Sequence, residues 1–335
     1  MQLLAGRLLH LLAPMVIYHS DISYSLPTSL TVLNMKTQGL TCIDFDTLNQ
    51  LKNLKEIYYK DANMFYFPDK DCSNSVPEED PRILYLPELT ELTLAGIKLG
   101  KVPNLSLMPK LEVLDLNSNR EFSEIPGTPF ANNVNLRNIN FHGIKLSTAP
   151  NLTGGCGNID FINLQWNSFA SVPDNYFEGC SIRAISWANT YLTSFPNHNP
   201  LGSSLEQINL EGTRIVGVIT SEMVKGLTNL KGMNIKRAQL SGVDVNFCHN
   251  SHLTIFDVDR NNNLEFFENP YRFCMSLVDT LVDTPHIKMP STKIPCDYRR
   301  CWMKKLASKI SITIDACPDG RSWSSVTEAE LCSQG

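Results

Sequence analysis

The residues best suited to metal chemistry in this chain are Cys248, His249 and His252, in the stretch CHNSH. Thiolate and imidazole groups are ligands that zinc prefers, but a zinc site needs further ligands at set spacings. No such partners follow or precede this stretch, and Cys248 has an alternative use in a disulfide. The sequence therefore predicts no metal site.

A glycine-rich stretch, TGGCGN around Gly154 and Gly155, is the nearest approach to a phosphate-binding loop. Such loops follow a strand and open a helix, whereas this stretch lies between two repeat units and predicts a turn. There is no G-x-S-x-G or HExxH stretch, and no nucleophile with a partnered base can be named. We therefore expect no catalytic residue, no cofactor and no enzymatic activity.

Composition narrows the class of protein. The chain has 335 residues, 42% of them hydrophobic, with a formal net charge of −5, so nothing favours disorder or a nucleic-acid partner. It has ten cysteines, an even number, and none of them stand in a Cys-x-x-Cys pair. Disulfides in an oxidising compartment are the favoured use, which predicts an extracellular, secreted protein.

The chain ends give two further expectations. Residues 1–20 predict either a weak signal peptide or a disordered start, because the apolar run is interrupted by Arg7, His10 and Pro14. That run is too short and broken to span a bilayer, and no apolar tail follows Cys332. We therefore expect no membrane insertion.

An internal repeat organises most of the chain. The pattern L-x-x-L-x-L-x-x-N-x-L can be placed ten times, with apolar residues at positions one, four and six throughout. Position one falls at Leu30, Leu54, Leu89, Leu111, Leu136, Ile159, Ile182, Leu205, Leu230 and Leu253. We predict about ten leucine-rich repeats over residues 21–285, with an inserted loop near 69–84, and a cysteine-rich cap over 286–335.

Each repeat predicts a short strand followed by an irregular return. Hydrophobic–proline pairs such as Val102-Pro103 and Val172-Pro173 stop the strand and turn the chain outward. One unit cannot bury its own leucines, so stacking must supply the core. The predicted fold is an α/β solenoid, a leucine-rich-repeat horseshoe with a parallel β-sheet on the concave face and an irregular or 3-10 convex side.

Position nine of the repeat usually holds an asparagine that satisfies backbone groups in the turn. Here asparagine stands there only at Asn119, Asn167 and Asn261, while the other seven repeats have other residues. We expect an irregular solenoid with some loosened turns.

Four cysteines follow the last repeat, namely Cys296, Cys301, Cys317 and Cys332, with Trp302 beside the second. This segment resembles the cysteine-rich carboxy-terminal cap of extracellular leucine-rich-repeat proteins, although the first two cysteines are more widely spaced here. The resemblance implies the pairs Cys296–Cys317 and Cys301–Cys332, and a small disulfide-bonded cap.

The cap also carries a more specific resemblance. Its C-D-x-x-x-C-W opening and later A-C-x-D-G stretch are similar to secreted arthropod leucine-rich-repeat proteins, among them the non-catalytic subunit of decapod luciferase. That similarity implies an alternative function, as a non-catalytic subunit of a secreted enzyme complex.

The six remaining cysteines predict three further pairs. Cys156 and Cys180 have nearly the same phase in consecutive repeats, so that neighbouring turns bring them close. We predict Cys156–Cys180, with two buried free thiols as the alternative, and also Cys248–Cys274 and Cys42–Cys72.

Two sequons, at Asn104 and Asn151, predict glycosylation on the outer return, where glycans leave the concave face free. A basic run in the cap, formed by Arg299, Arg300, Lys304, Lys305 and Lys309, predicts either a solvated face or docking to an acidic surface.

The partner site is predicted on the concave face. Polar residues or tyrosine fill position five of every repeat, and the middle repeats add aromatic and charged side chains. Trp166 and Phe161 should point outward beside Asn163; packing of Trp166 against neighbouring turns is the alternative. The candidate residues are Arg137, His142, Phe161, Asn163, Gln165, Trp166, Arg183, Glu211, Lys236 and Arg237. We expect a secreted, non-enzymatic recognition or scaffold protein that binds a partner protein or a glycan there.

Overall fold

The computed structural model describes residues 9–10, 26–35, 45–60, 67, 84–122, 124–281, 284–289, 293–314 and 316–333. The chain divides into two compact units, Met1–Ser168 and Phe169–Gly335, called unit 1 and unit 2 below. The predicted Cys42–Cys72 pair and almost all of the predicted insertion near 69–84 lie outside the described residues, as does most of the 1–20 segment.

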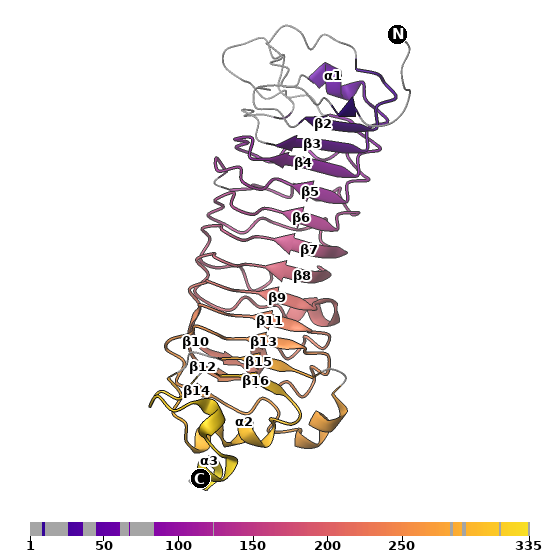
Figure 1. The fold of residues 1–335 in the computed structure, drawn as a ribbon. Coiled ribbons are helices and arrows are strands. Elements are labelled where there is room, and N and C mark those ends of the chain that lie inside the picture. The colour runs from indigo at the N-terminus through magenta and orange to yellow at the C-terminus, as the bar shows by residue number, and fades with distance from the viewer. Residues whose placement is uncertain are drawn as a thin grey trace. The chain divides into compact units, whose positions relative to one another are not determined.

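Unit 1 contains a parallel β-sheet whose strands are neighbours in chain order (Figure 1). One short helix, α1 (Phe45–Asn49), lies between its second and third strands in the chain. The strands are β1 (Leu9–His10), β2 (Val32–Met35), β3 (Glu56–Lys60), β4 (Glu91–Ala95), β5 (Val113–Asp115), β6 (Asn138–Asn140) and β7 (Ile159–Asn163).

Unit 2 repeats this arrangement. Its main strands are β8 (Ile182–Ser186), β9 (Gln207–Asn209), β11 (Gly232–Asn234), β13 (Ile255–Asp257), β15 (His286–Lys288) and β16 (Ser311–Thr313). Short helical turns are η1 (Asn199–Ser204), η2 (Ser221–Met223), η3 (Met275–Thr280), η4 (Tyr298–Arg300), η5 (Trp323–Ser325), α2 (Cys301–Lys305) and α3 (Glu328–Cys332).

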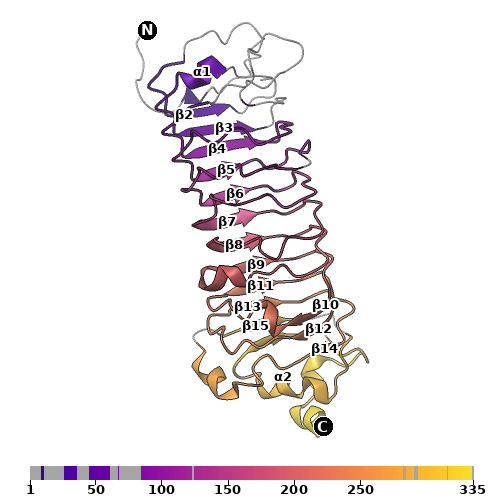
Figure 2. The same cartoon turned by 180° about the vertical axis from the view of Figure 1, so that it is seen from behind.

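A second parallel sheet in unit 2 was not predicted. It consists of β10 (Val216–Thr220), β12 (Gln239–Asp244) and β14 (Phe266–Phe267), which lie apart from the main strands (Figure 2). These segments are rich in β-branched and aromatic residues, and Ile219, Val243 and Phe267 are buried. Such residues favour strands when one face packs on a core, so the return segments of unit 2 pair with one another.

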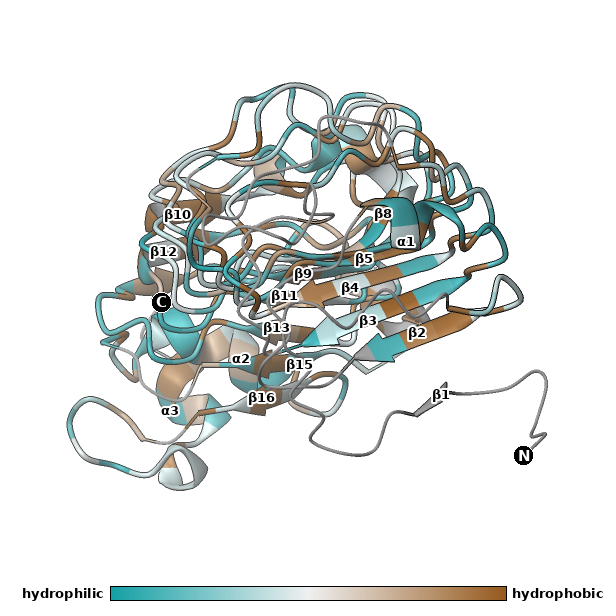
Figure 3. Ribbon diagram, turned by 90° about the horizontal axis from the view of Figure 1, so that it is seen from above, coloured by the Kyte–Doolittle hydropathy of each residue, from teal (hydrophilic) through white to brown (hydrophobic). Residues whose placement is uncertain are grey.

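The strand register matches the repeat pattern in both units. Position-four residues face one another from strand to strand, as in Leu92↔Leu114 and Ile208↔Met233. Positions one, four and six of the ten repeats give thirty predicted core residues. Leu30 is half-buried, and the side chain of Met35 is not among those described. Each of the other core residues is buried, with at most 6% of its surface exposed. The leucine-rich-repeat solenoid is therefore confirmed as the fold class. Hydrophilic and hydrophobic residues occur within single strands, as β2 and β3 show (Figure 3).

The parallel sheet continues into the predicted cap. Ile287 of β15 faces Phe256 of β13, and Ile312 of β16 faces Ile287. The boundary expected at residue 286 therefore does not separate sheet from cap, because an apolar residue at position four recurs there without the rest of the pattern. Among the described residues, no helix has the length and apolar character needed to cross a bilayer.

The position-nine asparagines are fully engaged. In Asn119, Nδ2 donates to the carbonyls of Leu94 and Leu116, and Oδ1 accepts from the N–H groups of Ile97 and Leu99. Asn167 and Asn261 make equivalent bonds in their own turns.

Repeats that lack asparagine at position nine fill the same place in other ways. The hydroxyls of Thr190 and Thr213 donate to the carbonyls three residues earlier, at 2.7 and 2.8 Å. Ile97 and Ile144 are buried there instead. In the described repeats without this asparagine, a hydroxyl hydrogen bond or a buried apolar side chain therefore stabilises the turn. The sequence had predicted that such turns would be loosened.

Disulfides hold the carboxy-terminal region. Cys296–Cys317 and Cys301–Cys332 are present, the two pairs that the family resemblance implies, and Cys248–Cys274 is also present as predicted. Val326 and Leu331 pack with Cys317 in a small separate core. Cys156 and Cys180 are each disulfide-bonded, which rules out the free-thiol alternative; that they pair with each other stays a prediction.

Candidate partner-binding surface

The exposed face of the parallel strands carries positions three, five, seven and eight of each repeat, and we call it the strand face. Position eight, where the chain leaves the strand, has the same backbone conformation in every described repeat from Leu89 onward, with φ between 55° and 69°. In unit 1 this set is Gly96, Ser118, Gly143 and Trp166; in unit 2 it is Asn189, Gly212, Arg237 and Arg260.

This left-handed turn keeps neighbouring repeats hydrogen-bonded. The N–H of Gly143 donates to the Gln165 carbonyl at 2.9 Å, and in unit 2 the N–H of Gly212 donates to the Lys236 carbonyl at 2.8 Å. Glycine and asparagine adopt positive φ at little cost, whereas a bulky side chain does so at about 1–2 kcal/mol. Among the position-eight residues, the left-handed conformation is therefore least favourable for Trp166, Arg237 and Arg260.

The strand face of unit 1 has an exposed aromatic pair on one strand and its turn. Phe161 on β7 is 39% exposed and faces Asn138 of β6, while Trp166 is 58% exposed. Gly143 occupies the matching position of the preceding repeat, and nothing lies within 4 Å of the place where its side chain would be. The indole of Trp166 is thus exposed, not packed into the neighbouring turns.

The other predicted residues of unit 1 surround this pair. Arg137 is exposed, and its carbonyl accepts from the N–H groups of Asp160 and Phe161 at 2.7 and 3.1 Å. His142 and Gln165 are half-buried on neighbouring turns of the same face. The six predicted residues of unit 1 therefore lie on two adjacent repeats, spread from Arg137 just before β6 to Trp166 beyond the end of β7.

Position five has a structural role that the sequence interpretation missed. Asn163 Oδ1 accepts from the Gln165 N–H at 3.1 Å, which closes the turn that presents Trp166. Asp115, Asn140, Asn209, Asn234 and Asp257 accept from the residue two positions later in the same way. Most of the polar side chains at position five therefore stabilise the turns by accepting hydrogen bonds from the backbone, as asparagine and aspartate commonly do.

Two position-five residues are buried: Thr93 and Ser186 are each 3% exposed. At Tyr58, burial and then a hydrogen bond with Glu91 raise the pKa of the phenol well above its ordinary value. These residues are part of the sheet packing and are poor candidates for partner contact.

The strand face of unit 2 carries a charged network. Arg237 Nη1 lies 3.8 Å from Glu211, and Lys236 Nζ lies 3.5 Å from Asp259. Arg260 also approaches Asp259, at 3.6 Å. Arg183, the fourth predicted residue of this unit, is exposed.

Asp259 and Arg260 were not among the predicted site residues. They occupy positions seven and eight of the repeat that follows the one with Lys236 and Arg237. The charges at position seven alternate in sign from Glu211 to Lys236 to Asp259, and this alternation could have indicated the ion pairs from the sequence. Asp259 is only 8% exposed, so its pairs with Lys236 and Arg260 are largely shielded from solvent, whereas Arg237 and Glu211 are more exposed. Ion pairs between exposed side chains contribute little to stability, so the Arg237–Glu211 pair leaves charged groups that a partner can re-pair.

The residues that the sequence offered for metal or phosphate binding have structural roles. Cys248 is bonded to Cys274 and cannot ligate a metal as a thiolate. The TGGCGN stretch forms the predicted turn, in which Gly154 has φ +85° and a side chain would meet the Cα of Ala131 at 2.6 Å. Within the described ranges, no group of three or more potential metal ligands comes together.

The basic run of the cap is divided among different contacts. Arg300 is fully buried and donates to the Ile294 carbonyl, and burial lowers the pKa of Arg300 to about 10. Lys304 Nζ donates to the Trp323 carbonyl at 2.9 Å and lies over its ring, and Arg299 pairs with Asp297. These three residues stabilise the cap itself, so the run is not a continuous basic surface.

Comparison with known proteins supports the fold. No family model matches the chain. It is 24% identical to Tsukushi of Gallus gallus over 220 residues, which are 64% of this chain and 56% of Tsukushi, so the chain spans about half of that relative.

Two solved structures share the architecture. One chain of the octameric complex of Latrophilin 3, Unc5D and FLRT2 has a TM-score of 0.61 at 17% identity, covering 95% of this chain and 96% of that one. An internalin of Listeria monocytogenes has a TM-score of 0.60 at 16% identity, covering 86% of this chain and 74% of that one. At these identities the likeness extends to the fold alone.

Proposed function

We propose that this leucine-rich-repeat chain is a secreted, non-enzymatic recognition protein whose strand face binds a partner protein. Repeat solenoids offer long surfaces and are used chiefly for binding. The disulfides of unit 2 are typical of an oxidising compartment, which supports secretion. The likeness to a chain from a complex of FLRT2 with Latrophilin 3 and Unc5D favours a protein as the partner.

The observation that carries this proposal is the exposure of Trp166 in a conformation that costs free energy. A tryptophan with φ 59° is unfavourable, and here the residue is 58% exposed, so burial offsets only part of the cost. Strained residues of this kind cluster at functional sites, where the surrounding structure holds them for binding. Tryptophan and arginine also dominate the binding energy of protein interfaces, and Phe161 on β7 is a second exposed aromatic residue of the same repeat.

Affinity capture with the intact secreted chain tests the proposal. A partner protein retained by the wild type should be lost by the double variant Trp166→Gly with Phe161→Ser, because both exposed rings are removed. Tyr85→Ala is the matched control, since Tyr85 is an exposed aromatic residue of the same unit away from β7. Retention of the partner by the double variant, with all proteins folded, would contradict a site on the strand face of unit 1.

The identity of the retained molecule separates the remaining alternatives. A small enzyme recovered in a constant ratio to this chain would favour the second function, a non-catalytic subunit of a secreted enzyme complex. A glycan that binds the wild type but not the double variant would place a saccharide on the strand face instead of a protein.

A further inference from the structure

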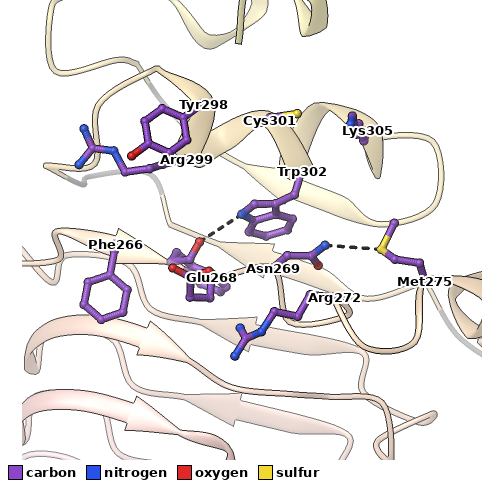
Figure 4. A pocket seen from close by; sticks show the side chains of 11 residues that line it. Phe266, Glu268, Asn269, Arg272, Met275, Tyr298, Arg299, Cys301, Trp302 and Lys305 are labelled. Carbon is purple, nitrogen blue, oxygen red and sulfur yellow. Dashed lines mark hydrogen bonds between the residues drawn. The ribbon is translucent and has the colours of Figure 1, made fainter. Parts of the chain in front are cut away.

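A pocket of about 490 Å³ lies in unit 2, where the segment after β14 meets η4 and α2 (Figure 4). Two chain segments form most of it: Phe266 to Arg272 on one side and Tyr298 to Lys305 on the other. The second segment carries Cys301, whose bond to Cys332 ties it to α3. The second wall is therefore fixed by a covalent bond to α3, within the same unit as the first wall.

Four aromatic residues line the pocket: Phe266, Phe267, Tyr298 and Trp302. Trp302 Nε1 donates to the Phe267 carbonyl at 3.1 Å, and its ring packs on Phe267 with centroids 5.6 Å apart. This bond fixes the indole across the two walls. Tyr298 is 54% exposed, so part of its ring remains uncovered at the mouth.

The two arginines that line the pocket are each held by an aspartate. Arg272 Nη2 is bonded to Asp244, and Arg299 Nε donates to Asp297 at 3.0 and 3.1 Å. The hydrogen bond from Arg299 lowers the pKa of Asp297, so this carboxylate stays charged. Because both guanidinium groups are fixed by these contacts, their remaining donors lose little conformational freedom on binding a ligand.

The charges of the pocket compensate one another. Besides the two arginine–aspartate pairs, the lining contributes one carboxylate, Glu268, and one ammonium group, Lys305. The amide of Asn269 is held by its own loop, with Nδ2 donating to Met275 Sδ at 3.5 Å (Figure 4) and Oδ1 accepting from the Tyr271 N–H at 2.9 Å, and it retains a second Nδ2 hydrogen and a second Oδ1 lone pair. A strongly anionic or cationic ligand would find no net opposite charge here, whereas a neutral ligand rich in hydroxyl groups would find fixed donors and acceptors beside aromatic rings.

We propose that this pocket binds a neutral saccharide. The apolar face of a sugar ring packs against Tyr298 and Trp302, and its hydroxyl groups donate to Glu268 and accept from Asn269 and the arginines. Burying hydroxyls without partners is costly, and the lining offers both kinds of partner. The site is separate from the strand face of unit 1, so it does not rest on the function proposed above.

Isothermal titration of the intact chain tests this with three neutral probes, the trimers of N-acetylglucosamine, glucose and mannose. At least one should bind, and Tyr298→Ala and Glu268→Gln should each weaken it by about tenfold or more, because each removes one of the two classes of contact. Tyr191→Ala, which truncates an exposed aromatic residue of the same unit outside the pocket, should bind as the wild type does. Trp166→Gly should also bind normally.

Three results would overturn the proposal. One is the failure of all three trimers to bind folded wild-type protein. Another is unchanged affinity in both Tyr298→Ala and Glu268→Gln. The third is binding of a sulfated heparin fragment alone, weakening as salt is raised, which would identify an anion site. Far-UV circular dichroism and thermal unfolding of each variant establish that it is folded.

Discussion

The indole Nε1 of Trp187 donates a hydrogen bond to Nε2 of His198 across 3.2 Å, inside the core of unit 2. Both residues are fully buried, and the imidazole stacks on Phe177 with centroids 5.2 Å apart. Since Nε2 accepts this bond, the ring is neutral and carries its proton on Nδ1. Burial lowers the pKa of His198 to about 3.

The buried Trp187–His198 pair predicts that the free energy of unfolding depends on pH. The unfolded chain binds a proton at His198 below pH 6.5, whereas the folded chain does so only near pH 3. The contribution of the neutral histidine is therefore complete above pH 6.5 and is lost as the pH falls towards 3, by at most about 1.4 kcal/mol for each pH unit. Denaturant unfolding at pH 7.5, 6, 5 and 4 measures the slope.

The matched variant for this prediction is His198→Gln, which keeps a hydrogen-bond acceptor but does not titrate. It should be less stable than the wild type at pH 7.5, and its stability should fall less steeply between pH 6.5 and 4. The other six histidines are present in both proteins, so the difference between the two slopes reports on His198. Equal slopes would show that folding does not lower the pKa of His198, because only a difference in pKa between the folded and unfolded states makes stability depend on pH.

Trp166→Gly should preserve or increase stability while removing the partner contact. Glycine relieves the positive φ, a gain of about 1–2 kcal/mol, and makes the unfolded chain more flexible, which offsets roughly 0.5–1 kcal/mol of it. Phe161→Gly is the comparison, because glycine in β7 weakens a strand and should destabilise the protein. The free energy of unfolding in urea distinguishes them; a large loss of stability in Trp166→Gly would mean that the indole is part of the packing.

Asn119→Ala should destabilise unit 1 by about 3 kcal/mol. The substitution leaves two carbonyls and two N–H groups without their buried partner, and each unsatisfied group costs about 1–3 kcal/mol before relaxation. Thr213→Val, which removes one comparable hydroxyl bond in unit 2, should cost about 1 kcal/mol. Equal losses in the two variants, measured by denaturant unfolding, would contradict the central role of asparagine in this turn.

Asn104 and Asn151 should both carry N-linked glycans when the protein is secreted from eukaryotic cells. Both side chains are exposed, and each accepts from the N–H of the serine or threonine two residues later, at 3.1 and 2.9 Å. Intact-mass measurement should show one glycan lost in Asn104→Gln or Asn151→Gln and both lost in the double variant. A wild-type mass that matches the bare polypeptide would contradict either the sites or passage through the secretory pathway.

The repeat frame was predictable because it depends on local spacing. Ile57, Leu92 and Leu114 stand at the same position of successive repeats, and strand pairing places them side by side. Stacking identical units buries these positions whatever the turns look like. The second sheet of unit 2 was missed, since β10, β12 and β14 have no common motif and gain their stability from pairing with one another.

The candidate surface was only partly predictable. The exposure of Phe161 and Trp166 follows from their positions in the repeat, but the sequence could not reveal that Asn163 is engaged with Gln165, or that Arg237 lies opposite Glu211. Both contacts depend on the turn conformation at positions seven and eight. The pocket beside Trp302 was not foreseen at all, because it joins segments about thirty residues apart that share no pattern.

The sequence by itself determined the solenoid and the residues of its core, since both follow from spacing along the chain, and the resemblance of its last four cysteines to a known cap implied the disulfide-bonded end. Tertiary structure decided which polar groups remain available. Asparagines of the strand face are used to close turns, basic residues of the cap are used to hold it, and Trp166 is left exposed at an energetic cost. These outcomes depend on what the adjacent turn presents, 22 to 25 residues away in the regular repeats, and no single repeat contains that information.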